Sequence, residues 1–325
     1  MIWPVPRTWQ ATMGAVVLAA DADNDDDAAR SALTWYDIGA VLSLDRLSTV
    51  HPAVRKVTTS AGTYLLKPAW RRADIALLAE LPALCSLGVP QPAVIRTGSG
   101  ELVCPGGYFL QEFLAGEPEL EPSGAQIRAV MRAVGGLHVA LSRLAASYEP
   151  DEDSVFVQVT DPAFLVVELP GLLRHFGLAT GPASAAIGRL AEHRAAIGAL
   201  PRQLVHGDIG PDNVLLDGEQ VVAIIDFAPH VMPVLFAVSS ALYWYHVYGQ
   251  QSLSAADVAD SWAAVAEARP WSAAEERLRV AGLVWEGLRR LATTLELARR
   301  TCSDPGSAAQ DRLAAVEAIA TLLPG

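Results

Sequence analysis

Hydrophobic and polar residues alternate over short stretches in the first third of the chain, which is typical of β-strands. Short strands are predicted at 41–44, 54–60, 63–67, 93–98 and 108–114. Ala61-Gly62 stands between the second and third of these and predicts a hairpin turn. A helical period covers 72–87, where Pro82 marks a kink or the start of a second segment. This part of the chain therefore predicts a small β-rich region with one helix.

The pattern changes after the polar, Gly- and Pro-rich segment 115–124, which indicates a linker. Long helical periods follow at 125–148 and 182–200, and the C-terminal part of the chain is again Ala-rich and helical. The exception is 204–227, where two apolar strands at 214–216 and 221–225 are joined by a four-residue link that begins with Asp217-Gly218. That dipeptide predicts a hairpin.

The pattern as a whole predicts an α+β chain with four parts. These are a partly mobile leader at 1–34, a β-rich lobe at 35–114, a linker at 115–124, and a helical lobe with the hairpin at 125–325. Of the 325 residues, 51% are apolar and 18% are charged, so the chain is long and apolar enough to build two cores.

The net charge of −12 excludes a general nucleic-acid binder, because such proteins neutralise phosphates with Lys and Arg. The acidic residues gather in 1–30, 117–121 and 149–153. Such clusters are typical of solvated faces, and the alternative is attraction of a cationic substrate.

Three distant cysteines, Cys85, Cys104 and Cys302, form no CxxC pair, which favours a reducing, cytoplasmic setting. The short apolar segment 13–20 is a weak signal for secretion. No apolar run reaches the roughly 18–20 residues that a membrane span requires, so no membrane partner is expected.

The hairpin brings three oxygen-bearing side chains to one end of its two strands. Asp208 and Asn213 precede the first strand, and Asp226 ends the second. Hard cations such as Mg²⁺ take oxygen ligands and keep waters and substrate phosphates besides. With Asn213 and Asp226 as metal ligands, Asp208 is left to accept a proton from a substrate hydroxyl. The D-x-x-x-x-N spacing from Asp208 to Asn213 is that of a kinase catalytic loop.

The segment 204–227 resembles the catalytic core of the aminoglycoside phosphotransferase family, a branch of the protein-kinase-like fold. The resemblance rests on the His-Gly-Asp motif at 206–208, Asn213 and the strand that ends at Asp226. It implies a bilobal α+β fold with a nucleotide-binding N-lobe and a larger, mostly helical C-lobe. It also implies that Asp208 is catalytic, that Asn213 and Asp226 bind Mg²⁺, and that His206 supports the loop by hydrogen bonds.

The resemblance further implies a lysine in the N-lobe that binds the phosphates of ATP. Lys67, at the end of strand 63–67, is the candidate, and Lys56 lies in an earlier strand that we expect to be more exposed. A glutamate on the next helix normally holds this lysine. Glu80 is the candidate for that role, and Asp74 is its competitor.

Two further nucleotide contacts are expected from position. The backbone of Glu112, Phe113 and Leu114 would bind the adenine edge, because this segment resembles the family's inter-lobe hinge. No G-x-G-x-x-G motif is present near the first strands, so Ser48 and Thr49 would supply donors to phosphate instead.

The segment after Asp226 departs from regulated protein kinases, because Ala228 replaces their glycine and the chain runs directly into an apolar helix. We therefore expect an ATP-dependent transfer of the γ-phosphate to a hydroxyl of a small molecule, such as an aminoglycoside-like antibiotic that the enzyme would inactivate, as in antibiotic resistance. One alternative is a kinase for Ser or Thr of a biosynthetic precursor peptide. Another is a pseudokinase that only binds, which the complete set Lys67, Asp208, Asn213 and Asp226 opposes. The aromatic run 241–249 predicts core residues together with some that stack on the substrate.

Overall fold

The computed structural model describes residues 22–47, 53–69, 72–81, 91–144, 159–179, 181–248 and 253–322. The chain divides into two compact units. Unit 1 comprises Met1–Ser86 with Pro90–Ala115, and unit 2 comprises Leu87–Val89 with Gly116–Gly325. Unit 1 is built on one antiparallel sheet, and unit 2 is mostly helical. The predicted α+β class is thereby confirmed.

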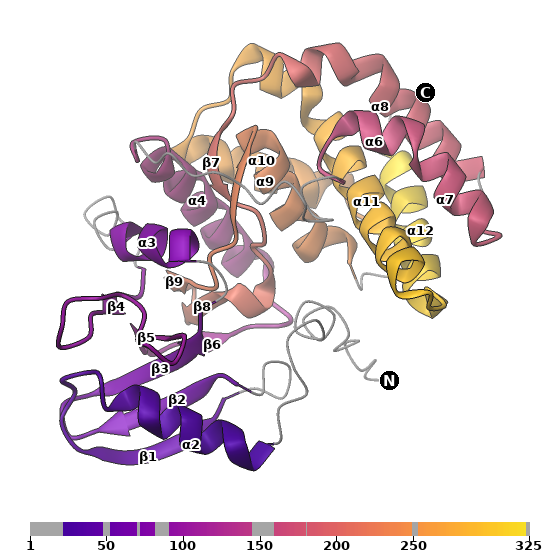
Figure 1. Cartoon of the computed structure of the whole chain (residues 1–325). Helices are drawn as coiled ribbons and strands as arrows, with labels where there is room; N and C mark the ends of the chain where they lie inside the picture. Colours follow the sequence, from indigo (N-terminus) through magenta and orange to yellow (C-terminus); the bar gives the residue numbers. More distant parts are fainter. Residues whose placement is uncertain are drawn as a thin grey trace. The chain divides into compact units, whose positions relative to one another are not determined.

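The sheet of unit 1 has five antiparallel strands in the order β1-β2-β3-β5-β4 (Figure 1). They are β1 (Val41–Arg46), β2 (Arg55–Thr59), β3 (Thr63–Pro68), β4 (Val94–Ile95) and β5 (Tyr108–Glu112). Helix α3 (Arg72–Glu80) follows β3, and the rest of the predicted helical period, 82–87, lies outside the described residues. Helix α3 ends two residues before Pro82, whose ring and missing N–H oppose a helix interior.

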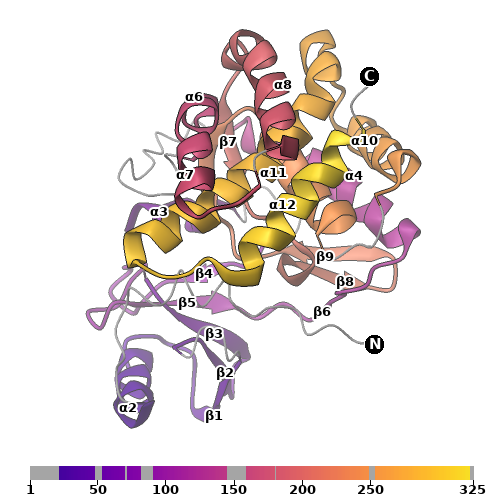
Figure 2. The same ribbon diagram turned by 90° about the vertical axis from the view of Figure 1, so that its right-hand side faces the viewer.

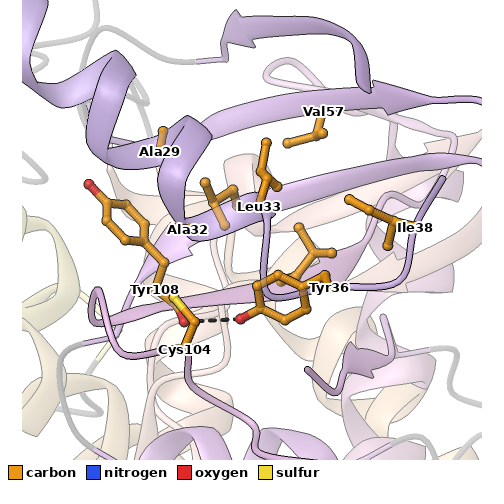
Figure 3. Packing of buried hydrophobic residues seen from close by; sticks show 10 residues of the cluster. Ala29, Ala32, Leu33, Tyr36, Ile38, Val57, Cys104 and Tyr108 are labelled. Carbon is orange, nitrogen blue, oxygen red and sulfur yellow. Dashed lines mark hydrogen bonds between the residues drawn. The ribbon is translucent and has the colours of Figure 1, made fainter. Parts of the chain in front are cut away.

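Helix α2 (Ala22–Leu33) lies in the segment that the sequence predicted to be a partly mobile leader. Its apolar residues Ala29, Ala32 and Leu33 are buried and pack with Val57 and other residues of the sheet (Figure 3). The helix was not predicted from the sequence, because acidic residues dominate the composition and its few apolar residues are hard to recognise as a helical period. Helix α2 therefore contributes these three residues to the core of unit 1.

An ion pair joins α2 to the sheet. Arg55 of β2 is fully buried, and its Nε and Nη2 lie 2.9 and 2.8 Å from Oδ1 of Asp26. In the same core the hydroxyl of Tyr36 donates to the carbonyl of Tyr108 at 3.1 Å (Figure 3). At least one member of the N-terminal acidic cluster thus has a structural partner.

The strands of unit 2 form two small sheets around the predicted hairpin. One sheet pairs β7 (Gln203–His206) with β10 (Pro229–Met232), and the other orders β6 (Glu117–Pro118), β8 (Val214–Asp217) and β9 (Gln220–Ile224). Asp217 pairs with Gln220, so the predicted hairpin turns through two residues rather than four. Gly218 allows the tighter turn because it adopts φ +59°.

Two of these strands lie where none was predicted. β6 falls in the expected linker, and β10 falls in the segment expected to enter a helix directly. Both are too short to show an alternating pattern. Because β10 pairs with β7, it holds the chain after Asp226 beside the strand that leads to Asp208.

Unit 2 is completed by α4 (Gly124–Leu141), α6 (Pro162–Val167), α7 (Leu169–His175), α8 (Gly181–Gly198), α9 (Val234–Leu242), α10 (Ala255–Ala268), α11 (Ala273–Thr301) and α12 (Gly306–Ala320). Helix α11 begins with a capping box between Ser272 and Glu275. It runs beside α12 (Figure 2), and Trp285 on α11 stacks on Phe236 of α9 with ring centroids 3.9 Å apart. Among the described helices, none combines the length and apolar character needed to cross a membrane.

Candidate active site

The loop between β7 and β8 is held by His206. The buried imidazole accepts from the backbone N–H of Asp208 through Nδ1 at 3.2 Å, and its Nε2 donates to the carbonyl of Ile225 at 3.1 Å. Burial lowers the pKa of His206, which favours this neutral form. The histidine therefore joins the loop to the end of β9, in line with the supporting role predicted for it.

Asn213 joins the loop to the hairpin from the other side. It ends a short 3-10 turn, Pro211–Asn213, and its side-chain Nδ2 donates to the carbonyl of Asp208 at 2.9 Å. Its own carbonyl accepts from the N–H of Ile225 at 2.8 Å. Because the amide nitrogen is used by the loop, the side-chain oxygen is the atom that remains to bind a cation.

Asp226 follows β9 in a left-handed backbone conformation with φ +51°. Aspartate tolerates that region better than most residues, yet it is uncommon outside glycine. The Ile225–Asn213 hydrogen bond brings the backbones of these two segments together, and Asn213 also contacts the main chain of Asp208. The convergence of the three side-chain oxygens stays a prediction. An amide oxygen and a carboxylate are hard donors that suit Mg²⁺ with phosphate oxygens. Within the described residues, no group of three or more His, Cys, Asp or Glu side chains could hold a metal on its own.

Asp208 keeps 43% of its side chain exposed, and two groups from distant helical segments contact one of its oxygens. The indole Nε1 of Trp244 donates to Oδ1 at 3.2 Å, and Nη2 of Arg290 lies 3.6 Å from the same atom. Sequence reasoning did not single out Arg290. The only signal for Trp244 was its place among the aromatic residues at 241–249.

Arg290 lies on α11 in a buried ionic cluster. Its Nε donates to Glu286 at 2.5 Å, and Glu286 also accepts from Arg289 at 2.7 Å. Burial alone would raise the pKa of Glu286, but the two guanidinium charges outweigh it and the net shift is downward. Glu286 is therefore ionised, and it compensates the charge of the arginine beside Asp208.

The aromatic run forms a π-helix, Tyr243–Val247, closed by a hydrogen bond of 2.8 Å from the N–H of Tyr248 to the carbonyl of Tyr243. Tyr243, Tyr245 and His246 are buried, as expected for core residues. Arg312 donates to the hydroxyl of Tyr243 at 3.0 Å. Trp244 is only partly buried and is the member of the run that reaches Asp208.

The predicted phosphate-binding lysine lies on β3 in unit 1. Leu66 faces the core that α2 covers, so its neighbour Lys67 faces the opposite side of the sheet. Lys56 pairs with Leu65 across the strands and shares that face. Strand geometry alone therefore does not separate the two lysines. Glu80 is the last residue of α3 and is exposed.

The predicted hinge residues begin at Glu112, the last residue of β5. The N–H of Glu112 donates to the carbonyl of Ala93 at 2.8 Å, and the N–H of Phe113 donates to that of Thr63 at 3.2 Å. Two of the three backbone donors are thus engaged within unit 1, and an adenine contact of Leu114 stays a prediction. Lys56 Nζ lies 4.4 Å from the ring centroid of Phe113. Ser48 and Thr49 lie outside the described residues.

Curated relatives share part of the chain. A homoserine kinase of Pseudomonas aeruginosa is 34% identical over 143 residues, which cover 43% of each chain. The chain therefore matches less than half of the length of that relative. A homoserine kinase of Methylorubrum populi is 29% identical over 227 residues, covering 65% of this chain and 66% of the relative.

Solved structures share the fold at low identity. An aminoglycoside phosphotransferase from Alicyclobacillus acidocaldarius has a TM-score of 0.65 at 16% identity, covering 90% of this chain and 94% of its own. An amicoumacin kinase solved with AMP-PNP, Ca²⁺ and its substrate has a TM-score of 0.66 at 13% identity, covering 92% and 96%. These likenesses confirm the protein-kinase-like fold.

The model of the phosphotransferase enzyme family matches residues 47–271, which include strands β2 to β5 of unit 1 and the hairpin of β8 and β9. The match confirms the resemblance found in the hairpin motif and extends over most of the chain. The protein belongs to the phosphotransferase enzyme family.

Proposed function

We propose that the protein transfers the γ-phosphate of ATP to a hydroxyl of a small molecule, with Asp208 as the catalytic residue. The observation that carries the proposal is the loop itself. The carboxylate of Asp208 is half-exposed, and both its main chain and its side chain are held by hydrogen bonds, one of them from Asn213.

In the proposed reaction, the acceptor hydroxyl gives its proton to the carboxylate of Asp208. The acceptor oxygen forms a bond to the γ-phosphorus, and the bond from that phosphorus to the bridging oxygen of ADP breaks. ADP leaves with the electron pair. Asn213 and Asp226 would hold Mg²⁺, which neutralises phosphate charge when bound. Lys67 would bind the phosphates, with Glu80 as its partner.

Two acceptor classes are supported by different observations. Relatives named homoserine kinase support an amino acid that carries a hydroxyl. Structures named aminoglycoside phosphotransferase, and the acidic cluster at 117–121, support a polycationic antibiotic. We propose the hydroxy amino acid first, because the homoserine kinases are 34% and 29% identical to this chain, whereas the aminoglycoside phosphotransferase is 16% identical.

A screen for acceptor-dependent ADP release, with product masses recorded, tests the proposal. The panel contains L-homoserine and other hydroxy amino acids, amino alcohols, aminoglycosides, and peptides with Ser or Thr. We expect one added phosphate on a small hydroxylated acceptor. Phosphate on peptides alone would replace the proposal with the peptide-kinase alternative. If no acceptor in the panel stimulated ADP release, the proposal would be rejected.

Two variants assign the roles within the loop. Asp208→Ala is expected to lower kcat by about 10³-fold or more while ATP still binds, because the proton acceptor is lost. Asp226→Ala is expected to weaken binding of Mg²⁺-ATP in titration calorimetry. Asp260→Ala is the control, since that carboxylate is exposed on α10. Normal turnover in Asp208→Ala would reject the catalytic assignment, and unchanged nucleotide affinity in Asp226→Ala would reject the metal assignment.

A further inference from the structure

We propose that Arg290 and Trp244 act as positioning residues that hold the carboxylate of Asp208 in one orientation for phosphate transfer. The inference rests on the proposed function, because it assumes that Asp208 is the proton acceptor. It concerns two side chains outside the hairpin, on α11 and in the π-helix, neither of which the catalytic motif includes.

Both contacts are made to the same carboxylate oxygen. Trp244 Nε1 donates to Oδ1 of Asp208 at 3.2 Å, and Arg290 Nη2 lies 3.6 Å from Oδ1. Since 43% of the Asp208 side chain remains exposed, Oδ2 is the oxygen offered to the acceptor hydroxyl. Fixing Oδ1 removes the rotation that would exchange the two oxygens, so the reactive oxygen is held in place before the substrate arrives.

The guanidinium of Arg290 is itself held on several sides. Nε is bound by Glu286 at 2.5 Å, Nη2 donates to Ser240 Oγ at 2.9 Å, and the indole ring of Trp244 lies 4.1 Å away. Ser240 in turn donates to the carbonyl of Gly207 at 3.3 Å. Arg290 therefore reaches the catalytic loop by two routes, through the side chain of Asp208 and through the backbone of its neighbour.

A second Glu-Arg-Arg group on the same helix serves as an internal comparison, because its ion pairs can stabilise the helix but do not contact Asp208. Glu296 pairs with Arg299 and Arg300 at 2.6 and 2.8 Å, with the same sequence spacing as Glu286, Arg289 and Arg290. Those two arginines lie at the surface. The first group carries the larger desolvation cost, because its arginines are buried as well, whereas in the second group only Glu296 is buried. The first group is the one that contacts Asp208.

The test uses two conservative variants with matched controls. Trp244→Phe removes the indole N–H, and Trp285→Phe is its control because Trp285 Nε1 donates at 3.2 Å to the carbonyl of Thr160 instead. Arg290→Lys keeps the charge but loses the planar guanidinium group with its several N–H donors. Arg300→Lys, in the exposed group, is its control. We expect kcat to fall about 10- to 100-fold in Trp244→Phe and Arg290→Lys. The KM for ATP and the KM for the acceptor should stay within about twofold of those of the parent protein. The controls should keep kcat.

A double-variant cycle shows whether the effect passes through Asp208. In an Asp208→Asn background, measured by single-turnover product mass, adding Arg290→Lys should lower the rate by less than about twofold, because the carboxylate it positions is gone. Full additivity of the two losses would overturn the inference, as would unchanged kcat in Arg290→Lys and Trp244→Phe. If Asp208→Asn alone retained normal turnover, the catalytic role of Asp208 in the proposed function would be rejected. That result differs from additivity, which rejects only the positioning role of Arg290.

Discussion

Helix α11 carries the same ionic group twice, and the two copies have different surroundings. The copies are Glu286 with Arg289 and Arg290, and Glu296 with Arg299 and Arg300. They stand ten residues apart, which turns the second roughly 280° from the first around an α-helix. The two groups therefore face different sides of α11.

The first group is buried and reaches the loop that carries Asp208, whereas the arginines of the second reach solvent. Arg299 and Arg300 expose 53% and 39% of their side chains, and the second group lines a cavity of about 400 Å³ with residues of α6 and α7. Hydrogen bonding to Arg299 lowers the pKa of Glu296, while burial opposes that shift. The comparison shows that the motif alone does not set the energetic role of an ion pair, because burial determines whether solvent can replace a lost partner.

The sharpest test of this comparison removes the glutamate of each group. Glu286→Ala leaves two buried guanidinium groups without their carboxylate, so we expect a loss of about 3–5 kcal/mol in unfolding free energy. Glu296→Ala should cost about 1 kcal/mol, because water can solvate its exposed arginines. Urea unfolding measures both values. Equal losses in the two variants would contradict the comparison.

A third ion pair, in unit 1, extends the comparison to a case with one buried and one exposed partner. Asp26→Ala leaves Arg55 buried without a carboxylate and should cost about 1.5–3 kcal/mol in unfolding free energy. Arg55→Met should cost less, since the half-exposed Asp26 can be solvated by water. Thermal or urea unfolding measures the asymmetry.

Turnover provides the control for this pair. Arg55 pairs with Leu66 and faces the α2 side of the sheet, opposite to Lys67. Both variants are therefore expected to keep kcat and the KM for ATP in the folded protein. A large loss of kcat in Arg55→Met would show that this ion pair is coupled to catalysis as well.

The smallest expected effect concerns His138, a fully buried titratable side chain of α4. Burial lowers the pKa of His138 to about 3 from the ordinary 6.5, and its Nδ1 bonds the carbonyl of Val134 at 2.8 Å. The unfolded chain takes up a proton near pH 6.5 and the folded chain does not. This contribution to stability is therefore complete above that pH and declines as the pH falls toward 3.

For one such histidine, the loss amounts to about 1 kcal/mol between pH 6.5 and 5.5. His138→Leu should flatten the plot of unfolding free energy against pH by that amount. Other buried histidines, including His206 and His230, keep part of the slope. An identical slope in His138→Leu and the parent protein would mean that His138 binds its proton in the folded state too.

The sequence predicted the part of the site that is local in the chain. His206, Asp208, Asn213 and Asp226 are brought together by a hairpin whose strands and turn are visible in the residue pattern. Trp244 and Arg290 lie 36 and 82 residues beyond Asp208, and only the packing of α9 and α11 brings them to it. No local pattern encodes such a contact, so these two residues were missed as partners of Asp208.

Helix α2, within the segment expected to be a partly mobile leader, was not predicted, for a different reason. The acidic residues dominate the composition of that segment, whereas the three buried positions Ala29, Ala32 and Leu33 carry little hydrophobic signal. The partner of Asp26 is Arg55, which belongs to a strand that the pattern did predict. A charged segment can thus be ordered by contacts that its own sequence does not show.

The π-helix at Tyr243–Val247 makes the length of this segment as important as its composition. Its closing hydrogen bond spans five residues, one more than in an α-helix. Deletion of a single residue would allow regular α-helix and turn one side of the segment by roughly 100° relative to the other. Natural variants of this chain should therefore tolerate exchange of the core tyrosines better than a one-residue gap, because only the gap swings Trp244 away from Asp208.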